Sequence, residues 1–213
     1  EYNIHDVRLV KRLHDKLDFI DMARGVCHVG HVPYEDVYFS SRYLEGAILV
    51  YLKNLGVVAP NKPPRVEKKD DDKFAGAYVQ PPQRGKHDWV FDLDITSMYP
   101  SVIMSLNISP ETKIGKLSGW DAKEFMKGDK KTYTLKSGEK EMGKLTETEL
   151  KDFFDKNKVS VSSNGVLYRS DKKGLIPALL EKWFDTRVEY RKLMKKFGDA
   201  GDNEKYTYFK SRQ

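Results

Sequence analysis

A single aspartate between an apolar run and a tight turn constrains this chain more than any other feature. Trp89, Val90 and Phe91 lead to Asp94, and residues 95–101 behind it are mostly small, hydroxyl-bearing or rigid. A carboxylate at a strand end is held in place yet stays wet enough to ionise, and a following turn directs backbone N–H groups toward anions. The pattern predicts a site for magnesium and a phosphate chain.

Taken alone, Asp94 has a simpler interpretation as an aspartate that caps a turn. Asp92 lies two positions earlier, on the same strand face, because side chains alternate along a strand. It is either a second acid beside the site or a solvated, Lys-paired strand residue, and we favour the latter. The residues by themselves leave both questions open.

The charge balance is compatible with a polyanionic partner. Lys and Arg number 38 against 32 Asp and Glu, which gives a formal net charge of +6. Neutralisation of phosphates by Lys and Arg supplies most non-specific affinity for nucleic acid. Modest basicity is also common among soluble proteins, and the acidic run at residues 70–72 lies beside basic residues. Charge alone therefore does not establish nucleic-acid binding.

Cysteine usage and hydropathy indicate a cytoplasmic protein. Cys27 is the only cysteine, which excludes an intrachain disulfide and a Cys-rich zinc site. No apolar stretch approaches the length of a membrane span, and the charged N-terminus is not a signal peptide. We expect a soluble protein in a reducing cytosol.

Helical periodicity marks the first third of the chain. Apolar residues recur at helical spacing over residues 7–22, with Asp6 as a candidate N-cap, and again over residues 34–55. Residues 60–72 are rich in Pro and charge and read as a linker.

The sequence pattern after residue 72 predicts a mixture of strands and helices. We expect strands at residues 78–79 and 89–94, a short helix over 100–106, and a surface insertion over 113–158 with helical pieces at 121–126 and 147–154. Residues 159–161 and 166–168 predict a hairpin, because Asn164 and Gly165 suit a tight turn. A long apolar-striped helix follows Gly174, with Pro177 in its first turn and Gly198 as a plausible stop.

The octet at residues 94–101 resembles the first carboxylate motif of family B DNA polymerases. That motif reads Asp, two variable residues, Ser, an apolar residue, Tyr, Pro, Ser. It is matched by Asp94, Ser97, Met98, Tyr99, Pro100 and Ser101. The chain then continues into the polar turn at residues 107–112. The detail is similar to the replicative enzymes of large tailed bacteriophages.

Three further segments resemble the same family, in the correct order. Tyr2 and Asp6 resemble the last motif of a proofreading 3′–5′ exonuclease. Gly76 and Tyr78 resemble a Gly-and-Tyr segment that enters the palm and touches the template strand. Residues 174–177, with Arg187 and Arg191 on the helix behind them, resemble the first fingers helix.

This resemblance implies an α+β fold, with a partial palm sheet, flanking helices and a long fingers helix at the C-terminus. The implied divisions are the end of the exonuclease domain at 1–28, a connecting helical and linker region at 29–74, the first part of the palm at 75–173, and the start of the fingers at 174–213. A second Lys-bearing fingers helix and a later Asp-Thr-Asp turn, both expected in the family, do not occur in this sequence. We therefore interpret the chain as an internal fragment or one piece of a split polymerase, inactive alone.

The resemblance also assigns roles to individual residues. Asp94 would bridge two Mg²⁺ ions, with the backbone carbonyl of Ile95 as a further ligand. The amides near Ser97, Met98 and Tyr99 would bind the β- and γ-phosphates of a dNTP. Arg187 and Arg191 would contact the same phosphates. Tyr99 would stack beneath the incoming sugar and exclude a 2′-hydroxyl; its alternative is a core aromatic.

The implied function is template-directed DNA synthesis. Its partners would be primer-template DNA, dNTPs, a sliding clamp, and the remaining C-terminal polymerase part with the rest of the fingers, the second palm carboxylates and the thumb. Two alternatives stay open: a non-catalytic nucleic-acid-binding module on a palm scaffold, and a single-carboxylate phosphohydrolase, which lacks a second metal cluster in the sequence.

Overall fold

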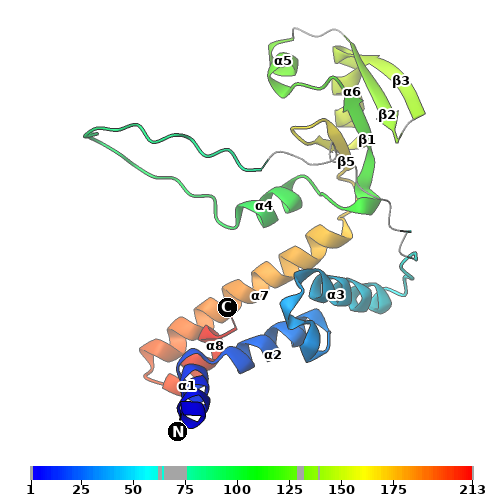
Figure 1. The fold of residues 1–213 in the computed structure, drawn as a ribbon. Helices are drawn as coiled ribbons and strands as arrows, with labels where there is room; N and C mark the ends of the chain where they lie inside the picture. Colours follow the sequence, from blue (N-terminus) through cyan, green and yellow to red (C-terminus); the bar gives the residue numbers. More distant parts are fainter. Residues whose placement is uncertain (1, 62–63, 65–75, 129–131, 139, 213) are drawn as a thin grey trace.

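The computed structural model describes residues 2–61, 64, 76–128, 132–138 and 140–212. It confirms the α+β class: one group of helices, one five-stranded antiparallel sheet, and a long helix near the C-terminus. Figure 1 shows the helical group below, the sheet above, and the extended segment before α4 projecting away from both. Most of the predicted linker at residues 60–72 lies outside the described residues.

The helical group is formed by both ends of the chain. Its members are α1 (Tyr2–Leu17), α2 (Phe19–Gly30), the 3-10 helix η1 (Tyr34–Tyr38), α3 (Ser40–Asn54), α7 (Leu175–Asp199) and α8 (Asn203–Lys210). Helix α2 packs on α3, and α7 packs on α8 and α3. The approach of α2 to α3 is close, because a Cβ added at Gly46 would lie 2.3 Å from the Gly30 carbonyl oxygen. Glycine is therefore required at this crossing.

Two predictions for the first helices are wrong. Helix α1 begins at Tyr2, so Asp6 lies inside it and is not its N-cap. The predicted helix over residues 7–22 is also broken at Asp18, which has a positive φ of 53° and whose N–H donates to the His14 carbonyl. Asp tolerates this left-handed conformation better than most residues, so the chain ends one helix there and starts another.

The sheet has the order β3-β2-β1-β5-β4. Its strands are β1 (Lys113–Ser118), β2 (Thr132–Ser137), β3 (Lys140–Thr146), β4 (Val159–Val161) and β5 (Val166–Arg169). The predicted hairpin is confirmed as β4 and β5, with Val161 opposite Leu167. Of its two turn residues, Gly165 is the one with a positive φ, 81°.

The main core lies on one face of this sheet. Leu117, Tyr133, Leu135 and Leu167 point into it from the strands, and Leu150 reaches it from α6 (Glu147–Asn157). Trp120 and Phe125 complete the aromatic side, with ring centroids 4.9 Å apart; Phe125 belongs to α5 (Ala122–Lys127). Both predicted helical pieces are therefore present, and Asp121 and Thr146 cap their first amides. The predicted insertion contains more regular structure than the sequence pattern indicates, because that pattern does not reveal β1, β2 and β3.

The predicted strands at residues 78–79 and 89–94 are not formed. Residues 76–95 are extended but lie in no ladder among the described residues, and Trp89 is 97% exposed. A strand needs a hydrogen-bonding neighbour, and the described part of the chain supplies none here. The short helix is confirmed as α4 (Met98–Ser105), starting two residues earlier than predicted.

Candidate functional site

Asp94 lies just ahead of the turn that starts α4. Thr96 and Ser97 form this turn, and Ser97 adopts a positive φ of 51°. Two bonds from Ser101 fasten the turn to the helix: its hydroxyl donates to the Thr96 carbonyl at 2.9 Å, and its amide donates to the Ser97 carbonyl at 2.9 Å. The small and hydroxyl residues of the octet thus build a defined corner behind the carboxylate.

The carboxylate of Asp94 is exposed and makes no hydrogen bond or ion pair with another described residue. The interpretation of Asp94 as a turn cap would require its carboxylate to accept a hydrogen bond from the turn, and the structure gives it none. The solvated Asp94 carboxylate and the backbone carbonyl of the exposed residue Ile95 offer oxygen ligands, which suit a hard cation such as Mg²⁺.

These oxygens are only part of a metal site. Within the described ranges, no group of three or more His, Cys, Asp or Glu side chains is arranged to hold a metal ion. The donor chemistry of Asp94 and Ile95 therefore fits Mg²⁺, and further ligands are needed to complete its coordination.

The first turn of α4 presents free backbone amides. The N–H groups of Met98 and Tyr99 belong to the first residues of the helix, which have no acceptor inside it. Such amides attract anions, phosphates included. The ring of Tyr99 is 72% exposed, so within the described structure it is not a core aromatic.

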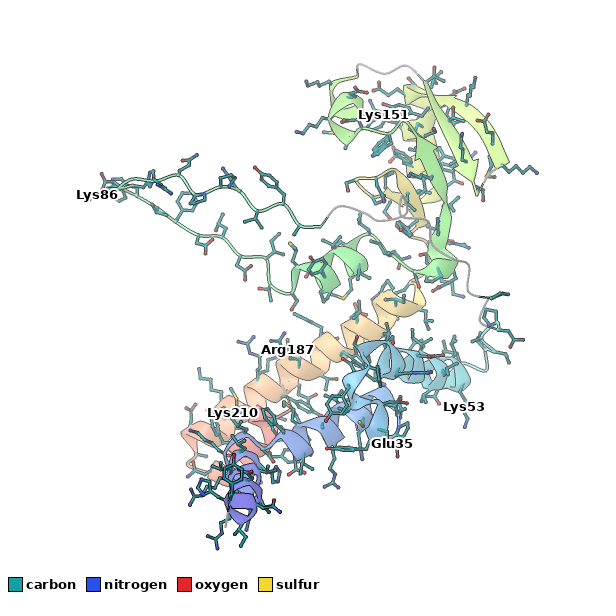
Figure 2. The ribbon with its side chains drawn as sticks, in the orientation of Figure 1. Glu35, Lys53, Lys86, Lys151, Arg187 and Lys210 are labelled. Carbon is teal, nitrogen blue, oxygen red and sulfur yellow. The ribbon has the colours of Figure 1, made fainter. Side chains whose placement is uncertain are left out.

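Arg187 and Arg191 lie one helical turn apart on α7, and both are exposed. Arg187 lies about midway along the helix (Figure 2) and has no ion-pair partner among the described residues. Helix α4 packs on α7. The turn after Asp94 and the arginine-bearing helix therefore belong to one packed unit, although no hydrogen bond or ion pair joins Asp94 to either arginine.

The loop between α4 and β1 holds the start of α7. Asn107, Ser109 and Glu111 accept hydrogen bonds from three successive amides, those of Gly174, Leu175 and Ile176: the Asn107 Oδ1 accepts from Gly174 at 2.8 Å, a Glu111 carboxylate oxygen from Leu175, and the Ser109 hydroxyl from Ile176 at 3.3 Å. These are amides that a helix cannot satisfy internally. The loop also includes the 3-10 helix η3 (Pro110–Thr112).

Gly174 is required where this loop and α7 meet. A Cβ added there would lie 2.8 Å from the Ser109 Cβ and 3.0 Å from the Thr112 Cγ2. Any larger residue would push the loop away from the helix. Close packing against Ser109 and Thr112 therefore explains why the predicted fingers helix starts with glycine.

The contact between the loop and the start of α7 lowers the pKa of Glu111. Burial raises the pKa of Glu111, but the hydrogen bond from the Leu175 amide and that from the Ser109 hydroxyl outweigh it, so the pKa lies below its usual 4.5. The carboxylate is therefore ionised at neutral pH at the positive end of the α7 dipole, where negative charge is stabilising.

The other predicted site residues lie apart from Asp94. Tyr2 and Asp6 are one turn apart on the exposed α1, so they share a face of that helix. Gly76 and Tyr78 lie in the extended segment, and a Cβ at Gly76 would meet no atom within 4 Å. The structure gives none of these four a contact with the Asp94 turn.

Sequence reasoning passed over the three side chains that cap α7. The sequence pattern identifies Asn107 only as part of a polar turn. A usable signal was the succession of Asn, Ser, Pro, Glu and Thr directly before a strand, since such residues satisfy backbone groups of turns and helix starts. Their partner lies more than 60 residues away, and spacing alone does not reveal it.

Comparison with known proteins finds a matching family model and several similar sequences. The model of DNA polymerase family B matches residues 37–213. The chain is 28% identical over 193 residues to the DNA-directed DNA polymerase of Enterobacteria phage T4, covering 91% of this chain and 19% of that protein. It is 25% identical over 193 residues to that of Escherichia phage RB69, covering 91% of this chain and 18% of that protein.

An archaeal relative matches a shorter stretch. The DNA polymerase of Archaeoglobus fulgidus is 39% identical over 83 residues, which cover 38% of this chain and 10% of that protein. The chain spans about a fifth of the length of the phage relatives. Because the family model matches most of its residues, the chain belongs to DNA polymerase family B.

Proposed function

We propose that this chain carries one part of the active centre of a template-directed DNA polymerase. The observation that supports it best is the exposed, unpartnered Asp94 on a fixed turn, followed by free amides at the start of α4 and packed onto the helix that carries Arg187. The Asp94 carboxylate can bind a cation, and the amides of α4 and the guanidinium of Arg187 can bind anions; all belong to one packed unit. A metal–triphosphate complex presents both charges together.

In this proposal the residues divide the work of nucleotidyl transfer. Asp94 and the Ile95 carbonyl hold the cations and align the primer end with the triphosphate. The amides at Ser97, Met98 and Tyr99 bind β- and γ-phosphate oxygens, and Arg187, with Arg191 one turn on, orients the triphosphate. Magnesium held by Asp94 and the Ile95 carbonyl would supply activation of the primer 3′-hydroxyl and neutralisation of charge on the leaving pyrophosphate. The ring of Tyr99 lies against C2′ of the incoming sugar.

The chain needs further polymerase segments for this chemistry. A C-terminal part would supply neighbouring strands that bury the exposed apolar side chains at residues 89–93. It would also supply the second carboxylates that complete the metal site. Tyr2 and Asp6 would contribute to an exonuclease site in the same way, and Gly76 and Tyr78 to template contact. A sliding clamp is a further proposed partner.

A non-catalytic DNA-binding module is the second candidate. The absence of a complete metal cluster from the described residues favours it. Primer extension with Mg²⁺ and dNTPs separates the two: the catalytic proposal requires activity when this chain is combined with the C-terminal part of a family B polymerase, and none from the chain alone. Absence of activity in every combination, with DNA binding intact, would favour the module.

In the part of the chain that the structure describes, no helix combines the length and apolar character needed to cross a membrane.

A further inference from the structure

The sheet has a second face, turned away from the α5 and α6 core. The core residues alternate along the strands with the outward-pointing residues. Strand register assigns to this outer face Lys113, Lys116 and Ser118 of β1, Thr132, Thr134 and Lys136 of β2, Glu141, Lys144 and Thr146 of β3, and Val166 and Tyr168 of β5. Helix α6, which packs on β2, β3 and β4, covers the inner face.

Three lysines gather over β1, β2 and β3 on this outer face, and a fourth, Lys113, lies at the start of β1 opposite Tyr168. Lys116 and Lys136 are directly opposite each other on β1 and β2, and Lys144 is opposite Thr134, one diagonal step from Lys136. Among the strand residues that share the face, Glu141 is the one carboxylate, 3.3 Å from the Lys136 Nζ. The face therefore keeps a net positive charge.

This arrangement costs stability in the chain by itself. Like charges directly opposite each other in a sheet are destabilising. Lysines often protect exposed edge strands from pairing with other chains, but β1 is the central strand of the five and β2 is its neighbour. Edge protection therefore does not account for Lys116 and Lys136, whereas an anionic partner would turn their repulsion into attraction.

The spacing and the neighbours of the lysines fit phosphates. Opposed positions in a sheet are about 5 Å apart and diagonal ones about 7–8 Å, while each DNA strand carries one charge per roughly 3.4 Å of helix axis. Thr134 lies opposite Lys144 and two residues from Lys136, and Ser118 lies two residues from Lys116; both hydroxyls are donors for phosphate oxygens, whereas the Thr146 hydroxyl already donates to Glu149. No arginine among the described residues of this face offers a bidentate contact to a base edge.

The outer face also adjoins the catalytic segment. The hydroxyl of Ser160, on β4, donates to the Leu106 carbonyl at the end of α4 at 2.5 Å. Ser160 is opposite Tyr168 and so shares the outer face. The chain thus runs from Asp94 through α4 to this side of the sheet.

We infer that the outer face formed by Lys116, Lys136 and Lys144 binds the phosphate backbone of duplex DNA without reading its sequence. The inference rests on the proposed function, for which it names a second DNA contact, separate from the Asp94 turn. In this inference the sheet at residues 113–169 binds the nucleic acid directly, in addition to its structural role in the palm.

The test is a salt titration of DNA binding. The variant K116Q/K136Q/K144Q is compared with K123Q/K127Q/K156Q, which removes three exposed lysines from α5 and α6 on the other side of the same sheet. Binding of a short labelled duplex of mixed sequence to the 213-residue chain is measured by anisotropy between about 50 and 200 mM salt. Melting curves accompany each variant.

The sheet-face variant should lose about 2–3 units from the slope of log affinity against log salt, at about 0.9 for each phosphate contact, and bind at least about tenfold more weakly at the lowest salt. Its melting temperature should equal or exceed that of the parent, because the Lys116–Lys136 repulsion is removed. The α5/α6 variant should keep nearly the parent slope. If the triple variant fails to fold, K116Q alone should lower the slope by about one unit.

The outcomes separate the two proposals. Equal slopes in the two triple variants would overturn the sheet-face inference and leave the proposed polymerase function standing. That result is also the one expected if the face docks another protein surface. A parent chain that binds no duplex at all would also overturn the sheet-face inference, whereas the proposed function is decided by primer extension with the C-terminal part.

Discussion

The side-chain carbonyl of Asn107 accepts a hydrogen bond from the backbone amide of Gly174 at 2.8 Å. The same side chain donates to the carbonyls of Arg169 and Lys172, at 2.6 and 2.9 Å. One buried amide, 7% exposed, therefore joins the end of α4 to β5 and to the start of α7. It fixes the helix that bears Arg187 relative to the helix that follows Asp94.

Asn107→Ala should lower the free energy of unfolding by about 2–4 kcal/mol. Each lost hydrogen bond contributes about 0.5–1.5 kcal/mol, and the abandoned buried partners add a desolvation cost. Asn107 also has a positive φ of 55°, which Ala adopts less readily. Urea denaturation measures the change.

Asn157→Ala is the matched control for this prediction. Asn157 is exposed and makes one local bond, from its Nδ2 to the Phe153 carbonyl at 2.9 Å. Its loss should cost well under 1 kcal/mol. Equal effects of the two substitutions would show that Asn107 does not join the helices.

Glu111→Gln should destabilise the chain at neutral pH by about 1 kcal/mol or less, because the lost charge caps α7 but lies partly in solvent. The folded-state pKa of Glu111 is depressed below 4.5. Its ionic contribution is therefore complete above pH about 4.5 and is lost as pH falls through the folded pKa.

The stability difference between parent and Glu111→Gln should accordingly shrink below pH 4.5. Denaturant titrations at a series of pH values measure it, with Glu189→Gln, an exposed change on α7, as the control. A difference that stays constant from pH 7 to well below pH 4 would rule out the charged cap.

Asp94→Asn should reduce turnover by several orders of magnitude in an enzyme reconstituted with the C-terminal polymerase part. The change keeps the side chain's shape but removes the charge that holds the cations. DNA affinity should stay nearly unchanged. Single-turnover primer extension measures turnover, and anisotropy measures DNA affinity. Near-normal turnover would show that Asp94 has a structural role and does not hold the cations.

Arg187→Ala in the same enzyme should mainly weaken dNTP use, through lost phosphate contacts. Steady-state kinetics should show a higher KM for dNTP with a smaller change in kcat. Lys182→Ala, an exposed cation on the same helix, serves as the comparison. Matching losses in the two variants would indicate a general charge effect of α7.

The predictions from sequence succeeded where the signal was local. The helix behind Gly174, the hairpin at residues 159–168 and the short pieces that became α5 and α6 all follow from periodicity, caps and turn residues. The predicted strand at residues 89–94 failed because an extended run becomes a strand only when a partner pairs with it. The apolar side chains of this run are exposed, and the described residues supply no strand to pair with it.

Long-range contacts account for the rest. Strands β1 to β3 are rich in Lys, Thr and Gly, with apolar residues such as Tyr133 and Leu135 only at alternate positions, so their pattern resembled a surface loop. The role of Asn107 depends on Gly174, 67 residues later. The candidate site was found as a short motif around Asp94, whereas the frame that positions it arises from pairings that the linear sequence does not display.

Tyr99→Ala distinguishes a sugar gate from a packing residue. The ring is exposed among the described residues, so truncation should have little effect on the stability of this chain, whereas a buried aromatic would lose about 3–5 kcal/mol. In the reconstituted enzyme the change should leave the Asp94 turn intact and open space beside C2′. Ribonucleotide use should therefore rise relative to deoxyribonucleotide use. The measurement is the ratio of kcat/KM for dNTP and rNTP in variant and parent, read beside melting curves of both. An unchanged ratio, with a large fall in melting temperature, would assign Tyr99 to packing within the complete enzyme.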